Sequence, residues 1–440
     1  MLTTSNKAGG RVGPAMVVVA TAAVAIAVRF AFVNEVNSDY RAFLSPWYDA
    51  LSAGGGLRAI GQQIGNYNPP YLYLLAVMTY LPIPKIIAIK LVSMVFDVVL
   101  AAFAGLIVRR RFNSWTSAVA FAVVLAAPTV LLNSGYWGQC DSIYAAFCLG
   151  SLYFLLRGRS WWACVFFGLA LSFKLQAIFF LPVLLIVLVA NRRRLLPLLA
   201  VPVTFLVMLL PAAVAGRSWR SLLTVYPDQV TGGAGSGFGR AGGGFGGGAP
   251  SLSGGLGAWT QNGPTMFQWV GGSVGWEVFG LVVAAGLLLG LGVLAWRTRP
   301  LGEPQIILLT TATVLAVPFF LPQMHERYFY LADVMTIVAA FYLRRFWPVA
   351  VAVSASSLLA YAPFLWRITP VPLPLVSFLE FLAVVATLVA AAHVLTTPGS
   401  RWIRGSTIAV ANGRWEAPEW DPALISPSGG RPAERPPSPA

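Results

Sequence analysis

The feature of this sequence that most constrains its fold is a succession of apolar runs between Ala15 and Val394. Most runs are roughly 14 to 24 residues long, and a helix of about 20 residues crosses a hydrocarbon layer of about 30 Å. Of the 440 residues, 57% are hydrophobic, compared with roughly 45–50% in soluble domains. The alternating pattern of a membrane β-barrel is absent. We therefore predict an all-α fold, a polytopic transmembrane helical bundle.

Basic residues indicate how this bundle is oriented. Lys7 and Arg11 precede the first apolar run, and positively charged flanks remain in the cytoplasm. The apolar segment 71–81 is short and bounded by prolines, so we expect it to lie at the outer surface instead of crossing. Every later arginine cluster, from Arg109 to Arg404, then falls on the cytoplasmic side. We expect a multi-pass protein of the cytoplasmic membrane with about twelve spans.

The same pattern divides the chain into parts. Residues 1–14 form a cytoplasmic N-terminus, residues 15–396 the transmembrane domain, and residues 397–440 a disordered cytoplasmic tail rich in Pro, Gly and Ser. External loops are expected at 34–85, which carries surface-lying helices, and at 215–275. The Gly-rich segment 232–248 of the second loop is predicted to be a flexible linker. The expected spans are 15–33, 86–108, 115–132, 142–156, 161–173, 176–190, 195–214, 276–296, 305–321, 328–343, 346–365 and 372–395.

The net charge of +15 is distributed in short clusters between the apolar runs. A protein that binds nucleic acid concentrates such charge on one soluble face. We therefore expect membrane lipids as partners and no nucleic acid.

With this orientation, polar residues from distant segments gather at the outer ends of the spans. Their common depth predicts a single cavity that opens outward at the lipid boundary. These residues are Asp39, Tyr67, Asn68, Gln139, Asp141, Lys174, Gln176, His325, Glu326 and Arg327.

Three of these residues have two interpretations each. Asp39 is either a general base, which takes a proton from a hydroxyl group, or a solvated acid that caps the next segment. Lys174 and Arg327 are cations that can stabilise a departing phosphate. Lys174 can instead reach toward the headgroups, and Arg327 can contact a headgroup or pair with Glu326 or Asp333.

The remaining polar residues divide between ligand contacts and structural roles. Gln139 and Asp141 either bind a ligand, or Asp141 caps its helix together with Ser142. Asp97 lies inside an expected span, so a pair with another helix is favoured over a functional role.

No metal site is predicted. His325 has no second histidine at helical spacing and is expected to donate a hydrogen bond instead of binding zinc. The other histidine, His393, is assigned to packing, and the cysteines Cys140, Cys148 and Cys164 show no disulfide or metal-ligand spacing.

Several short motifs together resemble a known group of enzymes. They are Tyr67-Asn68-Pro69-Pro70, Gly135-Tyr136-Trp137-Gly138-Gln139-Cys140-Asp141, Phe173-Lys174-Leu175-Gln176 and His325-Glu326-Arg327-Tyr328. Their order, following Asp39 in the first external loop, is similar to the GT-C superfamily of membrane glycosyltransferases. The likeness is to bacterial relatives of the GPI mannosyltransferases and of the dolichyl-phosphate-glucose glucosyltransferases.

The resemblance implies a transferase that uses a polyprenyl-phosphate sugar and an acceptor glycan, glycolipid or glycoprotein on the extracytoplasmic side. It maps the catalytic base onto Asp39 and contacts to the donor phosphate onto Lys174, His325 and Arg327. Substrate-binding positions are expected among the other polar residues, namely Tyr67, Asn68, Gln139, Asp141, Gln176 and Glu326. Some GT-C enzymes carry paired acids in the first loop and need a metal. Here Tyr40 follows Asp39, which favours transfer without a metal or other cofactor.

We therefore expect an inverting hexosyltransferase, and specifically a mannosyltransferase. Two other functions remain open. A transporter or flippase for a lipid-linked sugar would place its polar residues near the midplane and often shows two similar halves, which are not evident here. A polymerase or ligase acting on a lipid-linked oligosaccharide would share the outward cavity.

Overall fold

The computed structural model describes residues 9–231, 260–343 and 345–397. The predicted Gly-rich linker at 232–248 lies outside the described residues, as do residues 1–8 of the predicted N-terminus and residues 398–440 of the predicted tail.

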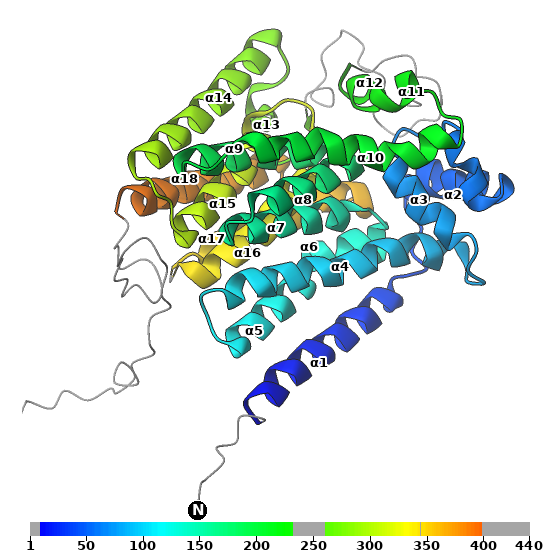
Figure 1. The fold of residues 1–440 in the computed structure, drawn as a ribbon, viewed down its shortest axis with the longest axis horizontal. Helices are drawn as coiled ribbons and strands as arrows, with labels where there is room; N and C mark the ends of the chain where they lie inside the picture. Colours follow the sequence, from blue (N-terminus) through cyan, green and yellow to red (C-terminus); the bar gives the residue numbers. More distant parts are fainter. Residues whose placement is uncertain (1–8, 232–259, 344, 398–440) are drawn as a thin grey trace, which may run out of the picture.

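The described residues form a helical bundle, as predicted (Figure 1). Two strands of two residues each, β1 (Thr260–Gln261) and β2 (Met324–His325), pair in parallel beside it. The longer helices are α1 (Gly9–Ala31), α4 (Lys85–Arg109), α5 (Ser114–Leu125), α7 (Asp141–Leu156), α8 (Ser160–Phe173), α9 (Leu181–Ala190), α10 (Ala200–Val214), α14 (Val274–Arg297), α15 (Glu303–Phe320), α16 (Tyr330–Tyr342), α17 (Trp347–Leu365) and α18 (Leu373–Thr396). The shorter ones are η1 (Tyr40–Leu44), α2 (Ser45–Ala53), η2 (Gly56–Gly61), α3 (Pro69–Met78), α6 (Pro128–Leu131), η3 (Leu132–Trp137), η4 (Leu175–Phe180), η5 (Leu196–Leu199), α11 (Trp219–Leu223), α12 (Val225–Thr231), α13 (Phe267–Val270) and η7 (Glu326–Phe329).

The protein is a multi-pass membrane protein. Among the described residues, seven helices are long and apolar enough to cross a membrane. An eighth candidate is the pair Ser114–Leu125 and Pro128–Trp137, which is bent by 51°. Each of the expected spans contains a helix, but α7, α8 and the segment Leu175–Ala190 are shorter than the seven. The number of about twelve spans therefore stays a prediction.

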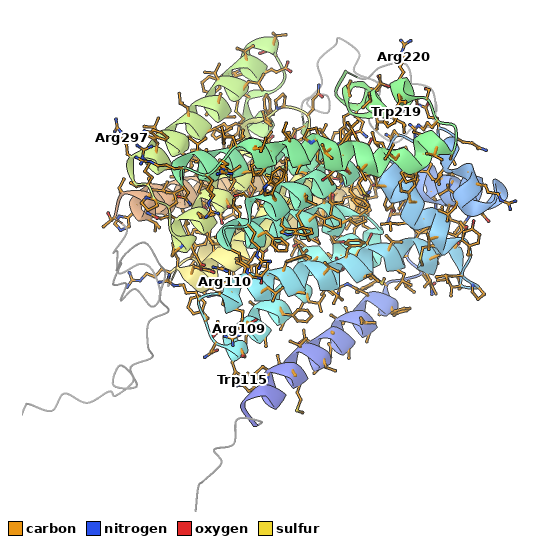
Figure 2. All side chains as sticks on the ribbon, viewed as in Figure 1. Arg109, Arg110, Trp115, Trp219, Arg220 and Arg297 are labelled. Atoms are coloured by element: carbon orange, nitrogen blue, oxygen red, sulfur yellow. The ribbon has the colours of Figure 1, made fainter. Side chains whose placement is uncertain are left out.

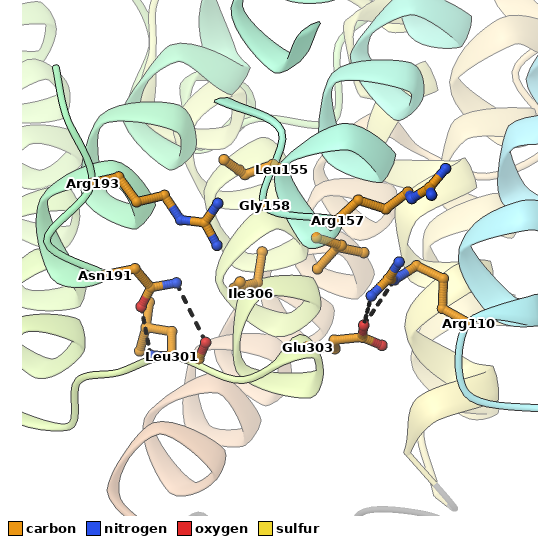
Figure 3. A pocket seen from close by; sticks show the side chains of 10 residues that line it. Arg110, Leu155, Arg157, Gly158, Asn191, Arg193, Leu301, Glu303 and Ile306 are labelled. Carbon is orange, nitrogen blue, oxygen red and sulfur yellow. Dashed lines mark hydrogen bonds and ion pairs between the residues drawn. The ribbon is translucent and has the colours of Figure 1, made fainter. Parts of the chain in front are cut away.

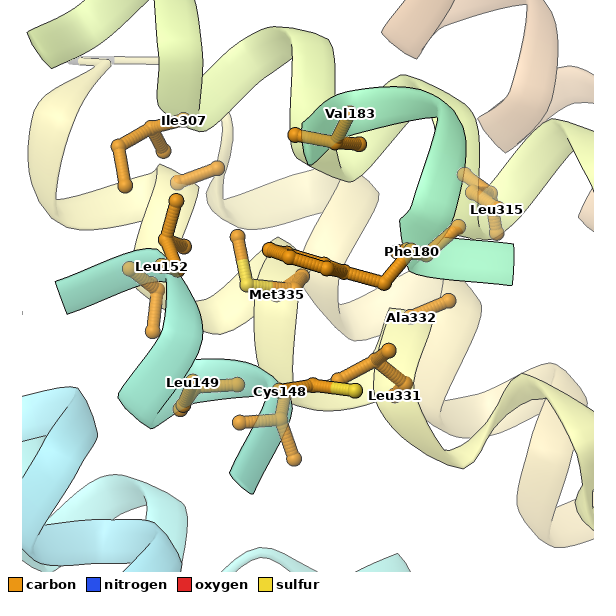
Figure 4. Packing of buried hydrophobic residues seen from close by; sticks show 14 of the residues in the cluster. Cys148, Leu149, Leu152, Phe180, Val183, Ile307, Leu315, Leu331, Ala332 and Met335 are labelled. Atoms are coloured by element: carbon orange, nitrogen blue, oxygen red, sulfur yellow. The ribbon is translucent and has the colours of Figure 1, made fainter. Parts of the chain in front are cut away.

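The core of the bundle surrounds α15. This helix is apolar on every side, and 89% of its most apolar window is buried, as expected of a helix without a polar face. Its neighbours include α9, α14, α16 and α18. Figure 4 shows part of this packing, in which Phe180 of η4 lies beside Met335 of α16, and Ile307 of α15 belongs to the same apolar cluster. By contrast, α1 lies at the edge of the bundle against α5, with 17% of its window buried.

The segment predicted to be the first external loop, residues 34–85, folds into a cap over one end of the bundle. Its helices α2, η2 and α3 enclose a second apolar cluster with Leu51, Tyr71 and Leu75 at its centre, all fully buried. α3 has 10 residues, or about 15 Å of helix, about half the thickness of the hydrocarbon layer. α3 also packs against α10. Within the protein, α3 is therefore covered by α2 and α10. The expectation that these helices lie at the outer membrane surface without crossing stays a prediction.

The bundle has two distinct ends. Figure 1 shows α2, α3 and α11 together at the right-hand end. Figure 2 shows Arg109, Arg110 and Arg297 at the opposite, left-hand end. α7 and α15 run between these ends, and with 16 and 18 residues they are about 24 and 27 Å long.

Candidate active site

Asp39 is held by the segment that follows α6. Residues Leu132–Trp137 wind as a π-helical turn, a rare geometry that is frequent at functional sites. The chain then reverses at Gly138, whose φ of 79° favours glycine. The reversal brings both side chains that flank Gly138 to one carboxylate oxygen: Trp137 Nε1 lies 2.9 Å and Gln139 Nε2 2.5 Å from Asp39 Oδ2.

The two oxygens of Asp39 have different surroundings. Arg327 Nη1 also approaches Oδ2, at 3.4 Å, so all three donors meet the same oxygen. Within the described ranges, no hydrogen bond to Oδ1 is present. The Asp39 side chain is 14% exposed. One oxygen therefore holds the carboxylate in place, and the other has no hydrogen-bond donor among the described residues.

The backbone around Asp39 is held by Asn37. Its side-chain amide donates to the Trp137 carbonyl at 2.7 Å, and its side-chain carbonyl accepts from the Tyr40 amide at 3.0 Å. These bonds join the segment that carries Asp39 to the segment that carries Trp137.

Lys174 is already paired with a carboxylate. α8 ends at Phe173 because Lys174 takes an extended conformation, with φ −153° and ψ 137°. Its ammonium forms an ion pair with Asp141, whose other oxygen accepts from Asn133 Nδ2 at 2.9 Å. The side chains of Lys174 and Asp141 are 7% and 0% exposed. The predicted phosphate-binding cation thus has a partner inside the protein.

The charge of Lys174 is retained despite its burial. Burial by itself lowers the pKa of this ammonium, but the Asp141 carboxylate more than compensates and the pKa is raised overall. Asp141 is the first residue of α7, and it does not cap that helix as one interpretation proposed. The ion pair with Asp141 takes the place of the headgroup contact that the other interpretation of Lys174 proposed.

Arg327 is less tightly engaged than Lys174. Its guanidinium lies 5.5 Å from the centre of the Trp137 ring and 3.6 Å from Glu326 Oε1. Its Nε atom is buried and has no hydrogen-bond partner within the described residues. Arg327 therefore keeps donor capacity for a ligand.

The same buried surroundings shift the pKa values of Glu326 and His325 in opposite directions. Burial raises the pKa of Glu326 to about 7, although Arg327 acts against this shift. Burial, together with the positive charges of Arg327 and Lys174, holds the pKa of His325 well below its usual value. The imidazole is therefore neutral at neutral pH, and its ring lies 5.0 Å from that of Tyr328.

Tyr67 and Asn68 are the predicted site residues that precede α3, and Tyr67 adjoins Gln139. The Tyr67 hydroxyl is 3.5 Å from Gln139 Oε1, and its ring is 5.7 Å from Lys174 Nζ. Asn68 is 1% exposed and precedes the prolines that begin α3. Gln176 lies in η4, two residues after Lys174, and its buried Oε1 accepts no hydrogen bond from the part of the chain that is described.

The contacts therefore unite most of the predicted residues. Asp39, Tyr67, Gln139, Asp141, Lys174, Glu326 and Arg327 form one connected group. Asn68 and His325 adjoin it as chain neighbours of Tyr67 and Glu326, and Gln176 lies two residues after Lys174. Trp137 was part of a quoted motif, but its role in holding Asp39 was not foreseen.

Two buried cations that the sequence analysis did not consider stabilise this arrangement. Arg29 of α1 pairs with Asp97 of α4 at 2.8 Å, which confirms the expected interhelical partner for Asp97. Lys90 is fully buried, and its ammonium donates to the carbonyls of Glu35 at 2.8 Å and Tyr136 at 3.0 Å. Both cations lie inside apolar runs, which is the signal that could have identified them.

In the ranges that the structure covers, no group of three or more His, Cys, Asp or Glu side chains is arranged to hold a metal ion. Independence from metal stays a prediction.

The sequence matches the family model described as "Glycosyltransferase family 87" over residues 66–322. The chain belongs to glycosyltransferase family 87. This family is of the GT-C type, so the predicted GT-C resemblance is confirmed and the protein is a membrane glycosyltransferase. The matched region of this family 87 protein contains Tyr67, Gln139 and Lys174. Arg327 lies five residues after its end, and Asp39 lies 27 residues before its start.

Two solved structures of ArnT from Cupriavidus metallidurans are similar to this family 87 protein. The structure bound to undecaprenyl phosphate is 15% identical in sequence, with a TM-score of 0.49, and the match covers 87% of this chain and 78% of that chain. For the apo structure the identity is 16%, the TM-score 0.37, and the coverage 86% and 77%. None of the curated proteins compared with the chain matches its sequence significantly.

Proposed function

We propose that this family 87 glycosyltransferase transfers a hexose, specifically mannose, from a polyprenyl phosphate to an acceptor glycan, glycolipid or glycoprotein, with inversion at the anomeric carbon. One observation carries the proposal. Asp39 and Arg327, which are 288 residues apart, meet beside Trp137, with a base oxygen left open on Asp39. Transfer from a sugar phosphate needs this combination of a base and a cation.

The proposed reaction is a single displacement. Asp39 Oδ1 takes the proton of the acceptor hydroxyl as its oxygen forms a bond to the anomeric carbon. The bond from that carbon to the phosphate oxygen breaks, and its electron pair leaves with the polyprenyl phosphate. Attack opposite the leaving group inverts the anomeric carbon. Arg327 stabilises the developing negative charge, since its Nε and its loosely held Nη1 are available as donors.

Lys174 has a more restricted role in this proposal. Its ammonium is paired with Asp141, so the two charges largely cancel. A phosphate near Lys174 must therefore share its ammonium with the Asp141 carboxylate. Arg327 is the principal contact to the donor phosphate. The protonation state of Glu326, whose Oε1 lies 3.6 Å from Arg327 Nη1, controls how much of Arg327 is available to the phosphate. A neutral Glu326 leaves Arg327 free for the phosphate, and a charged Glu326 competes with the phosphate for it.

The orientation in the membrane is also part of the proposal. We place Asp39 on the extracytoplasmic side of the cytoplasmic membrane, residues 1–14 and 397–440 in the cytoplasm, and the loops 34–85 and 215–275 outside. The position of Arg109, Arg110 and Arg297 at the end opposite the cap supports this orientation. A topology reporter fused after Arg111 should be located in the cytoplasm, and one fused after Gln229 should be located outside. The reverse result would overturn the assigned side.

The activity is tested with the purified full-length protein in lipid nanodiscs. It is incubated with radiolabelled polyprenyl-phosphate mannose or glucose and extracted envelope lipids, and the labelled product is identified. Mannose transfer supports the proposal, and glucose transfer alone corrects the sugar. Transfer of an intact oligosaccharide would favour a polymerase or ligase, and movement of the donor between leaflets without transfer would favour a flippase.

The role of Asp39 is tested by Asp39→Asn, which keeps the size of the side chain and removes the base. A positioned base contributes about 10²- to 10⁴-fold to the rate, so we expect a loss of that size with donor binding retained. Asp49→Asn is the matched control, because Asp49 belongs to the same loop but is 60% exposed and pairs with Lys85. Full activity of Asp39→Asn would remove Asp39 from this role.

A further inference from the structure

A cavity lies at the end of the bundle opposite Asp39. It has a volume of about 280 Å³ and is formed where α7 ends, α9 ends and α15 begins. Figure 3 shows Arg110, Arg157 and Arg193 around it, with Glu303 and Asn191 at its lower edge. Because α7 is about 24 Å long and begins at Asp141, this cavity is separated from the candidate active site by one helix length.

The charges that line this cavity do not balance. Its lining includes three arginines, Arg110, Arg157 and Arg193, and one acidic residue, Glu303. Arg110 Nε donates to Glu303 Oε1 at 2.7 Å and so uses that carboxylate. Arg157 has Tyr153 as a partner, through a hydrogen bond of 3.2 Å to the hydroxyl group. Arg157 and Arg193 therefore line the cavity without a negative partner from the described residues. The guanidinium of Arg193 points into the cavity, whereas that of Arg157 extends away from it (Figure 3).

Arg193 is the most informative of the three arginines. It is half-buried, and in the described part of the chain its side chain has no hydrogen bond or ion pair. Its guanidinium points into the cavity and packs over Gly158, where an added Cβ atom would lie 3.0 Å from Nη1. Burial lowers its pKa, and no nearby carboxylate opposes the shift. A half-buried cation of this kind is stabilised when an anion joins it.

A second cavity adjoins the first and indicates which anion fits. It has a volume of about 610 Å³ and shares Gly158 and Arg193 with the first cavity. Its lining combines Arg159 and Arg194 with the tryptophans Trp161 and Trp162, which are both 53% exposed. Tryptophan beside arginine is typical of the membrane interface, where a lipid presents a phosphate next to its glycerol and acyl chains.

We propose that Arg193, together with Arg110 and Arg157, binds the phosphate group of an anionic phospholipid at the end of the bundle opposite Asp39. Trp161 and Trp162 then contact the glycerol and the upper acyl chain of the same lipid. The shared chemistry is a phosphate ester, so a soluble phosphate could fill the arginine cavity alone, but it would leave the tryptophan cavity without a ligand. This site is separate from the proposed transferase activity and does not depend on it.

The experiment measures ligand binding to the purified full-length protein in zwitterionic nanodiscs. Phosphatidylglycerol is titrated in one arm, phosphatidylcholine in a second, and glycerol 3-phosphate in a third, with thermal stability and native mass spectrometry as readouts. We expect phosphatidylglycerol to raise the melting temperature in a saturable manner and to remain bound in the mass spectrum. Arg193→Gln should weaken its affinity about tenfold, as expected for one charge-assisted hydrogen bond.

Arg297→Gln is the matched control, because Arg297 is exposed at the same end of the bundle and does not line either cavity. It removes the same charge and should leave the affinity unchanged. Arg157→Gln provides a second test should Arg193→Gln fail to fold. Saturable stabilisation by glycerol 3-phosphate equal to that by the lipid would keep the phosphate site and overturn the lipid assignment. Equal losses in Arg193→Gln and Arg297→Gln, or no preference for phosphatidylglycerol over phosphatidylcholine, would overturn the site.

Discussion

Replacement of Trp137 by Phe tests how Asp39 is held. Trp137 is fully buried, and its indole N–H donates to Asp39 Oδ2 at 2.9 Å. Phenylalanine keeps an aromatic ring in the stack with Phe364, whose ring centre is 4.7 Å away. It removes the donor and also leaves part of the indole volume empty, which lowers stability. Gln139 and Arg327 still approach the same oxygen, so the carboxylate loses one of its three donors.

The expected size of the effect follows from the energy of this bond. A hydrogen bond to a charged group contributes about 1.5–3 kcal/mol, and about 1.4 kcal/mol corresponds to a tenfold change. If the bond is needed to aim Oδ1 at the acceptor, Trp137→Phe should lower kcat about 10- to 150-fold with a smaller effect on KM for the donor. The assay is steady-state sugar transfer, with the melting temperature measured in parallel.

Trp269→Phe is the control for loss of an indole hydrogen bond. Trp269 Nε1 donates to the Pro374 carbonyl at 2.8 Å, and Trp269 makes no contact with Asp39, so its replacement should leave kcat unchanged. Unchanged kcat in Trp137→Phe would refute the view that this bond aims the base. Equal losses of kcat and melting temperature in both variants would point to stability instead.

Three further predictions concern buried charges. Asp97→Ala should destabilise the protein by about 3–5 kcal/mol because it leaves Arg29 unpaired, and the loss should be measurable as a lower melting temperature; a change within about 0.5 kcal/mol, typical of surface sites, would contradict it. Lys174→Met should lower the melting temperature more than Lys174→Met combined with Asp141→Asn, because the double variant leaves no buried carboxylate without its cation; additive losses would argue against the pair. Burial raises the pKa of Glu326 from 4.5 to about 7, so stability should fall as the pH rises from about 4.5 to about 7 and the native carboxyl gives up its proton. Glu326→Gln should remove that part of the pH dependence, and an unchanged profile would assign it elsewhere.

The sequence by itself determined the architecture of the bundle. Each apolar run predicts a helix because a segment in a membrane must satisfy its backbone hydrogen bonds internally, and this requirement is local. The expected spans therefore coincide with helices such as α4, α14 and α18. The order of the spans also placed Asp39, Lys174 and Arg327 at the same end, since successive spans alternate in direction.

The partners of these charged groups were decided by the tertiary structure. Nothing local in the sequence indicates that Lys174 pairs with Asp141, because the contact depends on how α7 packs beside α8. The bond from Trp137 to Asp39 joins residues 98 apart and requires the π-helical turn, the reversal at Gly138 and the docking of the first loop. Composition and periodicity describe the surface of one helix, whereas a side-chain contact depends on the register and distance between several, and these are set when the whole bundle packs.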